Sequence, residues 1–220
     1  MSNRLDPARP TAELLVRAYV RGIFPMADPD TGRVEWFSPD PRAILPLESF
    51  HAPRSLERVA RASRFELRTD GCFEQVMREC AQPRPGRERT WIDERLVAAY
   101  LGLHRIGAAH SVEAWREGKL VGGLYGVHLG AAFFGESMFC RPEDGGRDAS
   151  KVCLLRLVEL LRARSFHLLD TQFSTEHLER FGCVPVARAR YLALLADALA
   201  HEATWPEPGV LPQLQQGALQ

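Results

Sequence analysis

The centre of the chain is the part that most constrains its fold. Three stretches rich in β-branched and aromatic residues follow one another with glycine turns between them, at residues 111–115, 120–128 and 131–140. Apolar residues at helical spacing then cover 149–164, and a short apolar stretch covers 166–172. This order predicts an antiparallel meander followed by one strand–helix–strand crossover, which places the chain in the α+β class.

The remaining elements flank this centre. Thr11 is a favourable N-cap for a helix that ends at Gly22, and the proline-rich stretch 28–46 predicts loop and short strand. A strand is expected at 65–69, and helices are expected at 53–62, 72–81, 92–106, 175–181 and 188–203. We therefore expect a small N-terminal α/loop domain at 1–62, a main domain with a mixed sheet and flanking helices at 63–205, and a loose tail at 206–220.

Composition argues against several classes of protein. The 220 residues have a formal net charge of zero, and 45% of them are hydrophobic, as in globular chains with one good core. No stretch reaches the ~18 apolar residues of a membrane-spanning helix, and the first ten residues lack the apolar region of a secretory signal. Five cysteines without C-x-x-C spacing and scattered histidines argue against a disulfide framework and a metal site. We expect a reducing, cytoplasmic location.

The basic residues are unevenly distributed although the total charge is neutral. Of the 28 basic residues, 26 are Arg. Arg54, Arg58 and Arg61 share one face of the expected helix at 53–62, and other Arg residues precede Trp91. Such a face can contact nucleic-acid phosphates while a ring such as Trp91 stacks on an exposed base. A solvated basic face and an Arg-rich genome explain the same pattern, so both interpretations stay open.

Two segments contain polar residues in apolar surroundings. Glu136 interrupts an apolar strand, and glycines are frequent in this strand and the preceding one. A buried carboxylate is costly unless it is paired or used, and strand glycines indicate that something approaches the backbone closely, so this segment favours a site. Asp170 and Gln172 share one face at the end of a strand and precede His177. A site and a helix cap explain that pair equally well.

A series of short motifs runs through residues 10–200. The motifs are Gly22-Ile23-Phe24-Pro25, Ser38-Pro39-Asp40-Pro41-Arg42, Thr90-Trp91-Ile92, Ala109-His110-Ser111-Val112-Glu113, Gly122-Gly123-Leu124-Tyr125-Gly126-Val127, Gly135-Glu136-Ser137-Met138-Phe139, Ala149-Ser150-Lys151 and Asp170-Thr171-Gln172. In this order they resemble the bacterial leucyl/phenylalanyl-tRNA–protein transferases. The resemblance implies an acetyltransferase-like (GNAT-type) fold and an enzyme that moves Leu or Phe from its tRNA to proteins beginning with Arg or Lys, marking them for degradation.

The resemblance also implies roles for individual residues. Asp170 and Gln172 would form the catalytic pair, and Trp91 would stack near the terminal adenosine of the tRNA. The donor side chain would lie in a pocket lined by Leu124, Phe133, Glu136, Met138, Leu154 and Leu169. A basic, tRNA-facing helix would carry Arg54, Arg58 and Arg61. Better-known members of the family have Trp after Gly-Ile-Phe-Pro where this chain has Met26, and Trp36 is the candidate to replace that ring.

The implied chemistry needs no cofactor and no metal. The chain has no [Q/R]-x-x-G-x-[G/A] pyrophosphate loop, which agrees with a fold that has dispensed with coenzyme A. We expect Asp170 to polarise and orient Gln172, whose carbonyl would hold the attacking amine, and we expect a monomer. Two rival hypotheses remain: a transferase with another acceptor, such as acidic N-termini or a cell-wall precursor, and a tRNA-binding regulator without catalytic activity.

Overall fold

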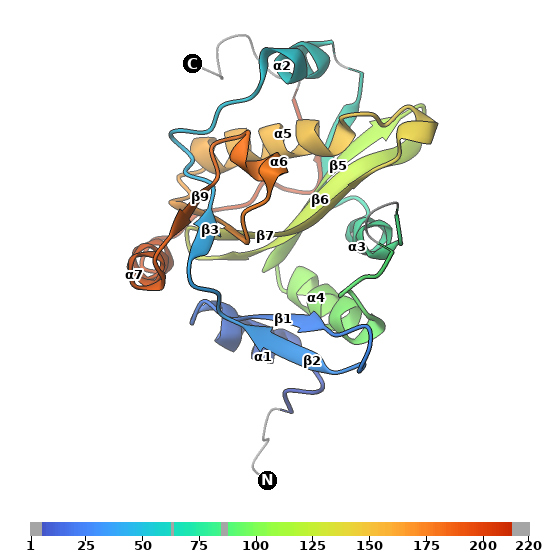
Figure 1. Cartoon of the computed structure of the whole chain (residues 1–220). Coiled ribbons are helices and arrows are strands. Elements are labelled where there is room, and N and C mark those ends of the chain that lie inside the picture. The colour runs from blue at the N-terminus through green and yellow to red at the C-terminus, as the bar shows by residue number, and fades with distance from the viewer. Residues whose placement is uncertain (1–5, 63, 85–87, 213–220) are drawn as a thin grey trace.

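The computed structural model describes residues 6–62, 64–84 and 88–212, and its centre is a mixed eight-stranded sheet (Figure 1). The strands lie in the order β10-β4-β5-β6-β7-β8-β3-β9, and β1 and β2 form a separate hairpin. The strand bounds are β1 Phe24–Ala27, β2 Val34–Phe37, β3 Arg42–Ile44, β4 Glu66–Thr69, β5 Ala109–Arg116, β6 Lys119–Leu129, β7 Ala132–Cys140, β8 Leu168–Gln172, β9 Val184–Val186 and β10 Gly209–Val210.

Helices cover both faces of this sheet. Helix α5 lies against β5, β6 and β7 and carries α2 on its outer side, whereas α3, α4 and α7 pack with α1 in the other hydrophobic cluster. The helix bounds are α1 Ala12–Tyr19, α2 Arg54–Arg61, α3 Phe73–Ala81, α4 Glu94–Arg105, α5 Ala149–Ala163, α6 Glu176–Glu179 and α7 Arg188–Leu199, with a short 3-10 helix at Pro142–Asp144. Within the described ranges, no helix has both the length and the apolar character that crossing a bilayer would require.

The strand pairing confirms the predicted meander and crossover. Strands β5, β6 and β7 pair antiparallel in sequence order, and Gly118 and Gly130 occupy their turns with positive φ. Strand β8 then pairs parallel with β7 after the α5 crossover. At the N-terminus, the Thr11 side chain accepts a hydrogen bond from the Leu14 N–H and caps α1 as expected. The α+β class with flanking helices is confirmed.

The glycines of β6 accommodate neighbouring parts of the protein. A Cβ at Gly122 would lie 2.5 Å from the Cβ of Ala149, where α5 begins, and a Cβ at Gly126 would lie 2.4 Å from the Phe133 ring. A side chain at either position would therefore collide with the protein itself. The close approach that these glycines predict is real, but its cause at both positions is packing within the chain.

The segments that precede and follow the expected main domain both contribute strands to its sheet. Strand β3 pairs with β8 and with β9, so the sheet already includes residues before the expected boundary at 62. The expected loose tail is wrong for residues 206–212, because β10 pairs with β4 and Leu211 is buried. Residues 213–220 of that tail lie outside the described residues. The sheet therefore joins chain segments that local sequence patterns place in different domains.

Candidate active site

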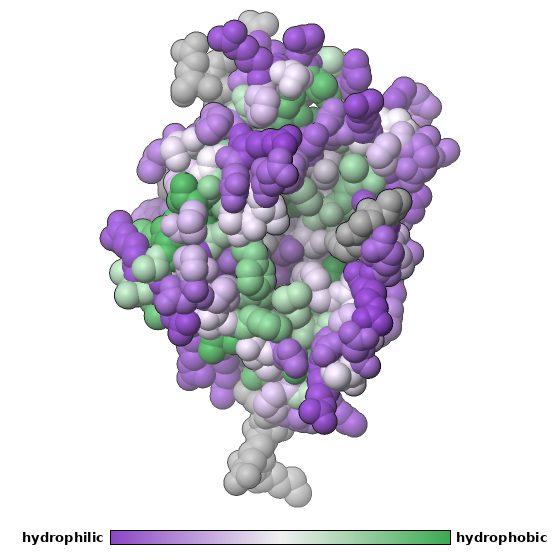
Figure 2. Space-filling view, in the orientation of Figure 1, coloured by the Kyte–Doolittle hydropathy of each residue, from purple (hydrophilic) through white to green (hydrophobic). Residues whose placement is uncertain are grey.

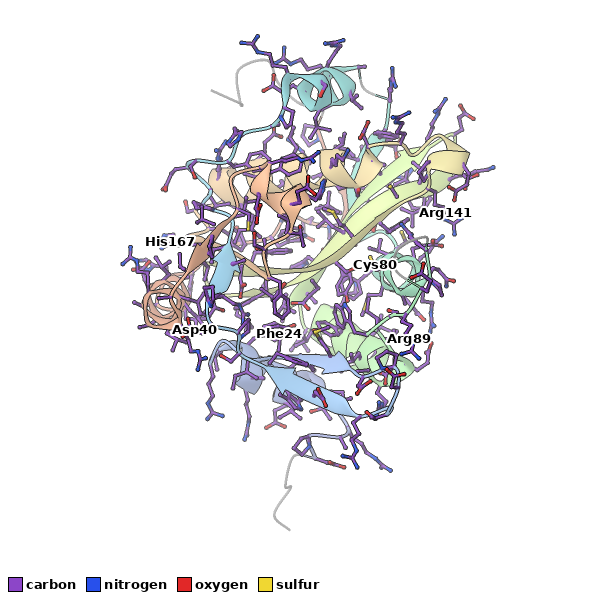
Figure 3. The ribbon with its side chains drawn as sticks, in the orientation of Figure 1. Phe24, Asp40, Cys80, Arg89, Arg141 and His167 are labelled. Atoms are coloured by element: carbon purple, nitrogen blue, oxygen red, sulfur yellow. The ribbon has the colours of Figure 1, made fainter. Side chains whose placement is uncertain are left out.

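A cavity of about 350 Å³ opens between the β1–β2 hairpin and the main sheet. Figure 2 shows hydrophobic surface gathered in this hollow and hydrophilic surface around it, and Figure 3 places Phe24 between the hairpin and the sheet. Its lining includes Phe24, Met26, Trp91, Leu124, Tyr125, Gly135, Glu136, Ser137, Met138, Leu154, Leu157, Leu169, Thr171, Gln172, Phe173, Thr175, His177 and Leu178. The cavity thus combines an apolar wall with a few polar groups, as small-molecule sites do.

Asp170 lies beneath this cavity and has no exposed surface. Its Oδ1 accepts hydrogen bonds from Arg42 Nε at 3.0 Å and from the Gln172 N–H at 2.8 Å. Its Oδ2 accepts from Arg42 Nη2 and from the Tyr191 hydroxyl, each at 2.7 Å. The carboxylate is therefore surrounded by donors from the protein and does not reach the space where a substrate would lie.

Arg42 is the counter-ion of Asp170 and is only 1% exposed. Its guanidinium lies 4.7 Å from the ring centroids of both Phe24 and Tyr191, and its Nη1 donates to the Gly22 carbonyl at 3.0 Å. A buried charge of this kind is tolerated only when it is paired and fully hydrogen-bonded. The pair therefore joins two motifs that are distant in the sequence, because Arg42 ends one of them, Asp170 begins the other, and the two residues are 128 positions apart.

Gln172 connects the buried pair to the cavity. It has the left-handed φ of 58°, and its N–H is held by Asp170. Its Nε2 donates to Glu136 Oε1 at 3.2 Å, which leaves Oε1 of the amide without a donor among the described residues. The amide oxygen is therefore available to a hydrogen-bond donor in the cavity. The expected grouping of Asp170 and Gln172 is present, although their contact runs through the backbone N–H of Gln172.

Glu136 is the carboxylate that lines the cavity. The Tyr100 hydroxyl donates to its Oε2 at 3.1 Å, and the hydroxyls of Tyr100 and Tyr19 are hydrogen-bonded to each other. Burial raises the pKa of Glu136 to about 7, an effect that the tyrosine hydroxyls oppose and the charge of Asp170 reinforces. A carboxyl group with a pKa near neutrality is suited to acid–base chemistry or to a charge that changes near pH 7.

The expected donor pocket matches the lining of the cavity at most positions. Leu124, Glu136, Met138, Leu154 and Leu169 all line it. Phe133 does not: its ring is fully buried in the core and stacks on Trp205 at a centroid distance of 5.3 Å. A β-bulge at Tyr125/Gly126 shifts the register between β6 and β7. The bulge leaves Phe133 on the same face of the sheet as Leu124 and Met138, in one hydrophobic cluster, and the contact with Trp205 is what buries its ring outside the cavity.

The structure separates the two expected tRNA-binding tryptophans. Trp91 lines the cavity, and with Met26 it also lines an adjoining hollow of about 340 Å³. Trp36 pairs with Pro25 across the hairpin, and its indole N–H donates to the Pro7 carbonyl at 3.2 Å. Trp36 lines neither hollow. The structure therefore does not bring Trp36 to the place of the ring that Met26 replaces.

The expected basic residues are distributed over several surfaces. Arg54, Arg58 and Arg61 are exposed on α2, outside the cavity, and Arg61 is paired with Glu57. In the loop before Trp91, Arg84 donates to backbone carbonyls of Cys140 and Glu79, so its guanidinium is engaged within the protein. Arg87 lies outside the described residues. Contact between tRNA and the exposed arginines of α2 thus remains a prediction.

Four site residues have no signal in the local sequence pattern: Tyr19, Arg42, Tyr100 and Tyr191. Tyr19 and Tyr100 belong to apolar helix faces that a periodicity argument assigns to the core. Arg42 closes the Ser-Pro-Asp-Pro-Arg motif, but proline-rich corners have a structural explanation of their own. From the sequence alone, Arg42 can be recognised as a site residue only when its distant acidic partner, Asp170, is already known.

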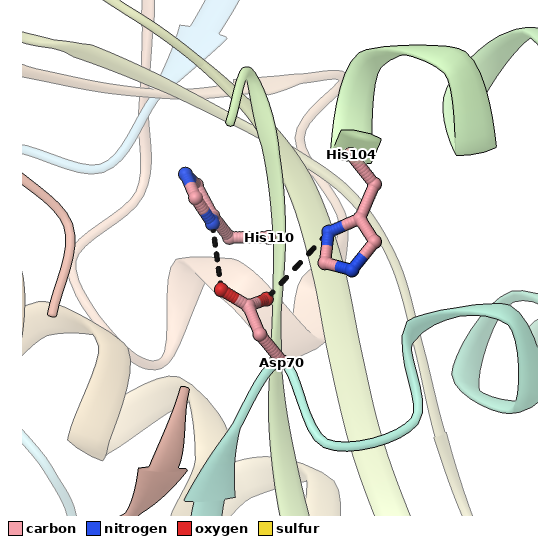
Figure 4. Close-up of side chains that lie close together, drawn as sticks. All are labelled: Asp70, His104 and His110. Atoms are coloured by element: carbon pink, nitrogen blue, oxygen red, sulfur yellow. Dashed lines mark hydrogen bonds and ion pairs between the residues drawn. The ribbon is translucent and has the colours of Figure 1, made fainter. Parts of the chain in front are cut away.

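Two groups of His and Asp side chains bring possible ligand atoms within 4.8 Å of one another, Asp70–His104–His110 and His167–Asp197–His201. Figure 4 shows the first group, in which His110 Nδ1 is 2.8 Å from Asp70 Oδ2. His104 Nδ1 lies 2.8 Å from the Ala109 carbonyl oxygen, which only accepts hydrogen bonds. That nitrogen therefore carries a hydrogen and has no lone pair for a metal. Neither group lines the cavity.

Solved structures of two other proteins show partial likeness to this chain. The structure of L-PGS from Bacillus licheniformis has a TM-score of 0.41 and 11% identity, covering 76% of this chain and 55% of that one. A ribosomal-protein-alanine N-acetyltransferase from Brucella melitensis biovar Abortus 2308 has a TM-score of 0.31 and 16% identity, covering 74% of this chain and 92% of that one.

Sequence comparison gives a much closer relation. A family model described as leucyl/phenylalanyl-tRNA protein transferase matches residues 44–196, and the model of its N-terminal domain matches residues 8–40. The leucyl/phenylalanyl-tRNA–protein transferase of Paramagnetospirillum magneticum is 54% identical over 196 residues, which cover 89% of this chain and 91% of that protein. The residues that line the cavity, together with Asp170 of the ion pair, fall within the two matched ranges. The chain belongs to the leucyl/phenylalanyl-tRNA–protein transferase family.

Proposed function

We propose that this chain transfers Leu or Phe from aminoacyl-tRNA to the α-amine of proteins that begin with Arg or Lys. The observation that carries the proposal is the set of groups at one cavity: an apolar wall, the amide of Gln172 and the carboxyl group of Glu136. The apolar wall suits a Leu or Phe side chain, and a carboxylate suits a cationic acceptor. We further propose a monomeric enzyme in a reducing cytoplasm, where the free cysteines would stay reduced.

The reaction exchanges an ester for an amide. The acceptor nitrogen attacks the ester carbonyl carbon, the C–N bond forms, the C–O bond breaks, and the proton lost by the amine reaches the departing ribose oxygen. Roughly a tenth to a fifth of an α-amine with a pKa of 7.7–8.0 is neutral at pH 7, so the nucleophile needs little activation. Alignment of amine and ester is then the larger contribution to rate.

The hydrogen bonds indicate how the residues share this task. Gln172 Oε1 is available to accept from the amine N–H, because Nε2 of the same amide is held by Glu136. Glu136 supplies negative charge beside that amine when it is ionised. Asp170 and Arg42 act as positioning residues, since their contacts fix the backbone of Gln172 from below. This assignment replaces the expected polarisation of Gln172 by Asp170 with control of its backbone conformation.

The test is transfer itself. The protein is mixed with labelled Leu-tRNA and peptides that begin with Arg, Lys, Asp or Glu, and a ribonuclease-treated tRNA serves as the control. We expect label on the Arg- and Lys-initiated peptides only, and only with intact tRNA. Label on acidic peptides would instead assign a different acceptor. No transfer at any enzyme concentration, with Leu-tRNA still bound, would indicate a regulator.

Arg58→Glu tests the predicted tRNA contact of α2. We expect weaker aminoacyl-tRNA binding and a salt dependence of log Kd that is shallower by about one unit, because one phosphate contact releases about one counterion. Filter binding across a range of salt concentrations measures both quantities. Arg105→Glu, an exposed position on α4, is the matched control. The same salt slope in Arg58→Glu as in the unmodified protein would remove α2 from the interface.

A further inference from the structure

An exposed aromatic ring lies at the cavity next to Gln172. Phe173 is 47% exposed, and it is the only aromatic residue among the large hydrophobic side chains that are exposed in the described part of the chain. It also lines the cavity. The other exposed hydrophobic residues, which are Val20, Ile106, Val184, Leu192 and Val210, do not. The ring of Phe173 therefore offers an exposed aromatic face to a molecule in the cavity.

The backbone directs this ring to its position. The left-handed conformation of Gln172 turns the chain sharply after β8, and the N–H of Phe173 donates to the Thr171 carbonyl at 2.6 Å. The ring of Phe173 meets Phe24 edge to face at a centroid distance of 5.7 Å. Because the buried ion pair fixes both Gln172 and Phe24, the ring of Phe173 is held by the same support as the amide.

The charges around the cavity favour a cation. Among the described residues that line it, Glu136 is the one carboxylate, and none is Lys or Arg. Burial and the charges of Lys151 and Arg180 lower the pKa of His177, which disfavours a positive charge on its imidazole. A carboxylate together with an exposed aromatic face is the combination that recognises cationic side chains.

The position of the Phe173 ring indicates that it contacts the acceptor protein and not the aminoacyl-tRNA donor. Trp91 and Met26 line the adjoining hollow in which the terminal adenosine would lie, and Phe173 does not line that hollow. The α-amine of the acceptor would lie at Gln172 Oε1, and Phe173, the next residue in the chain, lines the same cavity as Gln172. We propose that Phe173 forms the subsite for the side chain of the acceptor's N-terminal residue and favours Arg by a cation–π contact. This inference rests on the proposed transfer to basic N-termini.

Arg fits this subsite better than Lys does. A guanidinium is planar, is weakly hydrated and stacks on an aromatic face, whereas an ammonium is a compact and strongly hydrated charge. The ring is half exposed, so the interaction lies near the weaker end of the range for cation–π contacts. We therefore expect a modest effect on acceptor recognition and none on donor binding.

Phe173→Leu and a fluorination series test the proposal. Mono-, di- and trifluorophenylalanine at position 173 keep the shape of the ring while weakening the negative potential of its face. We expect KM for an Arg-initiated peptide to rise with each fluorine and to reach about three- to tenfold in Phe173→Leu. KM for Leu-tRNA should stay constant throughout. Ile106→Ala, an exposed hydrophobic position outside the cavity, is the matched control.

A peptide that begins with citrulline separates charge from shape, because citrulline is nearly isosteric with Arg and neutral. We expect its KM to be insensitive to fluorination. The proposed subsite would be wrong if fluorination raised KM equally for the Arg and citrulline peptides. It would also be wrong if fluorination changed KM for Leu-tRNA instead. Absence of any transfer to Arg-initiated peptides by the unmodified protein would contradict the proposed function. Normal transfer without a fluorine effect would contradict only the role of Phe173.

Discussion

Asp170→Asn should destabilise the protein by about 3–5 kcal/mol, because it leaves a buried guanidinium without its counter-ion. Arg42 is 1% exposed and has no route to water in the folded state. The asparagine amide also turns a donor toward groups that are themselves donors, namely Arg42 Nη2 or the Tyr191 hydroxyl. Urea unfolding at pH 7 measures the difference in the free energy of unfolding.

The same variant should lose about 100-fold in kcat/KM, since misplacement of an aligned group by about 1 Å has an effect of this size. The ionised acceptor that holds the Gln172 N–H in the left-handed conformation would be replaced by a neutral amide beside an uncompensated guanidinium. Affinity for aminoacyl-tRNA should change little at temperatures where the variant is folded. Equal losses in tRNA affinity and in turnover would refute the assignment of Asp170 to positioning.

Two further variants separate charge from position. Replacing both partners, as Arg42→Met with Asp170→Leu, removes the buried charges together and should restore most of the stability but none of the activity. Glu176→Gln removes the exposed pair between Glu176 and Arg180, in which the side chains are 83% and 66% exposed, and should change stability by less than about 1 kcal/mol. Recovery of activity in the double variant would show that Asp170 is not needed to hold Gln172.

The repeating parts of the fold follow from local sequence. Alternation of apolar residues and glycine turns is a property of neighbouring positions, so β5, β6, β7 and α5 are predictable from their own residues. Strands β9 and β10 are not, because they contain three and two residues, and β9 has a central proline. Such short edge strands form only because a partner from a distant part of the chain is already in place.

The candidate site shows the same division. Glu136, Asp170 and Gln172 stand out as polar residues in apolar strands, and a resemblance to a family supplies their roles. Arg42 and Tyr19 do not stand out, since their partners lie 128 and 81 positions away. Phe133 shares a hydrophobic cluster with Leu124 and Met138, and only its contact with Trp205, from a distant segment, shows that its ring is buried outside the cavity. Contacts between distant segments are therefore what the structure adds.

Glu136→Gln should change the dependence of transfer on pH more than any other single substitution at the cavity. The carboxyl group of Glu136, with a pKa raised to about 7, is neutral below that pH and charged above it. The acceptor α-amine becomes neutral with a pKa of 7.7–8.0. Both changes favour reaction as pH rises, so a plot of log kcat/KM against pH should approach a slope of two below pH 7 in the unmodified protein.

Glu136→Gln keeps the shape of the side chain but removes its titration. The slope should therefore fall to one, and kcat/KM at pH 8 should fall by about 100-fold, which is typical for loss of one electrostatic contact to the reacting groups. Single-turnover transfer to an Arg-initiated peptide between pH 5.5 and 8.5 (a range of about three units around the pKa) measures both. If the slope of two persists in the variant, the group that titrates together with the acceptor amine is not Glu136.

Tyr100→Phe provides an independent check of the same assignment. The Tyr100 hydroxyl donates to Glu136 Oε2, and this hydrogen bond favours the ionised carboxylate and lowers its pKa. Its removal should raise the pKa of Glu136 further and shift the rise in activity to higher pH, with the slope of two retained. A shift to lower pH would mean that the carboxyl group controlling the rate is not the one that Tyr100 contacts. Because Tyr100→Phe moves the profile while Glu136→Gln flattens it, the two variants together identify the titrating group.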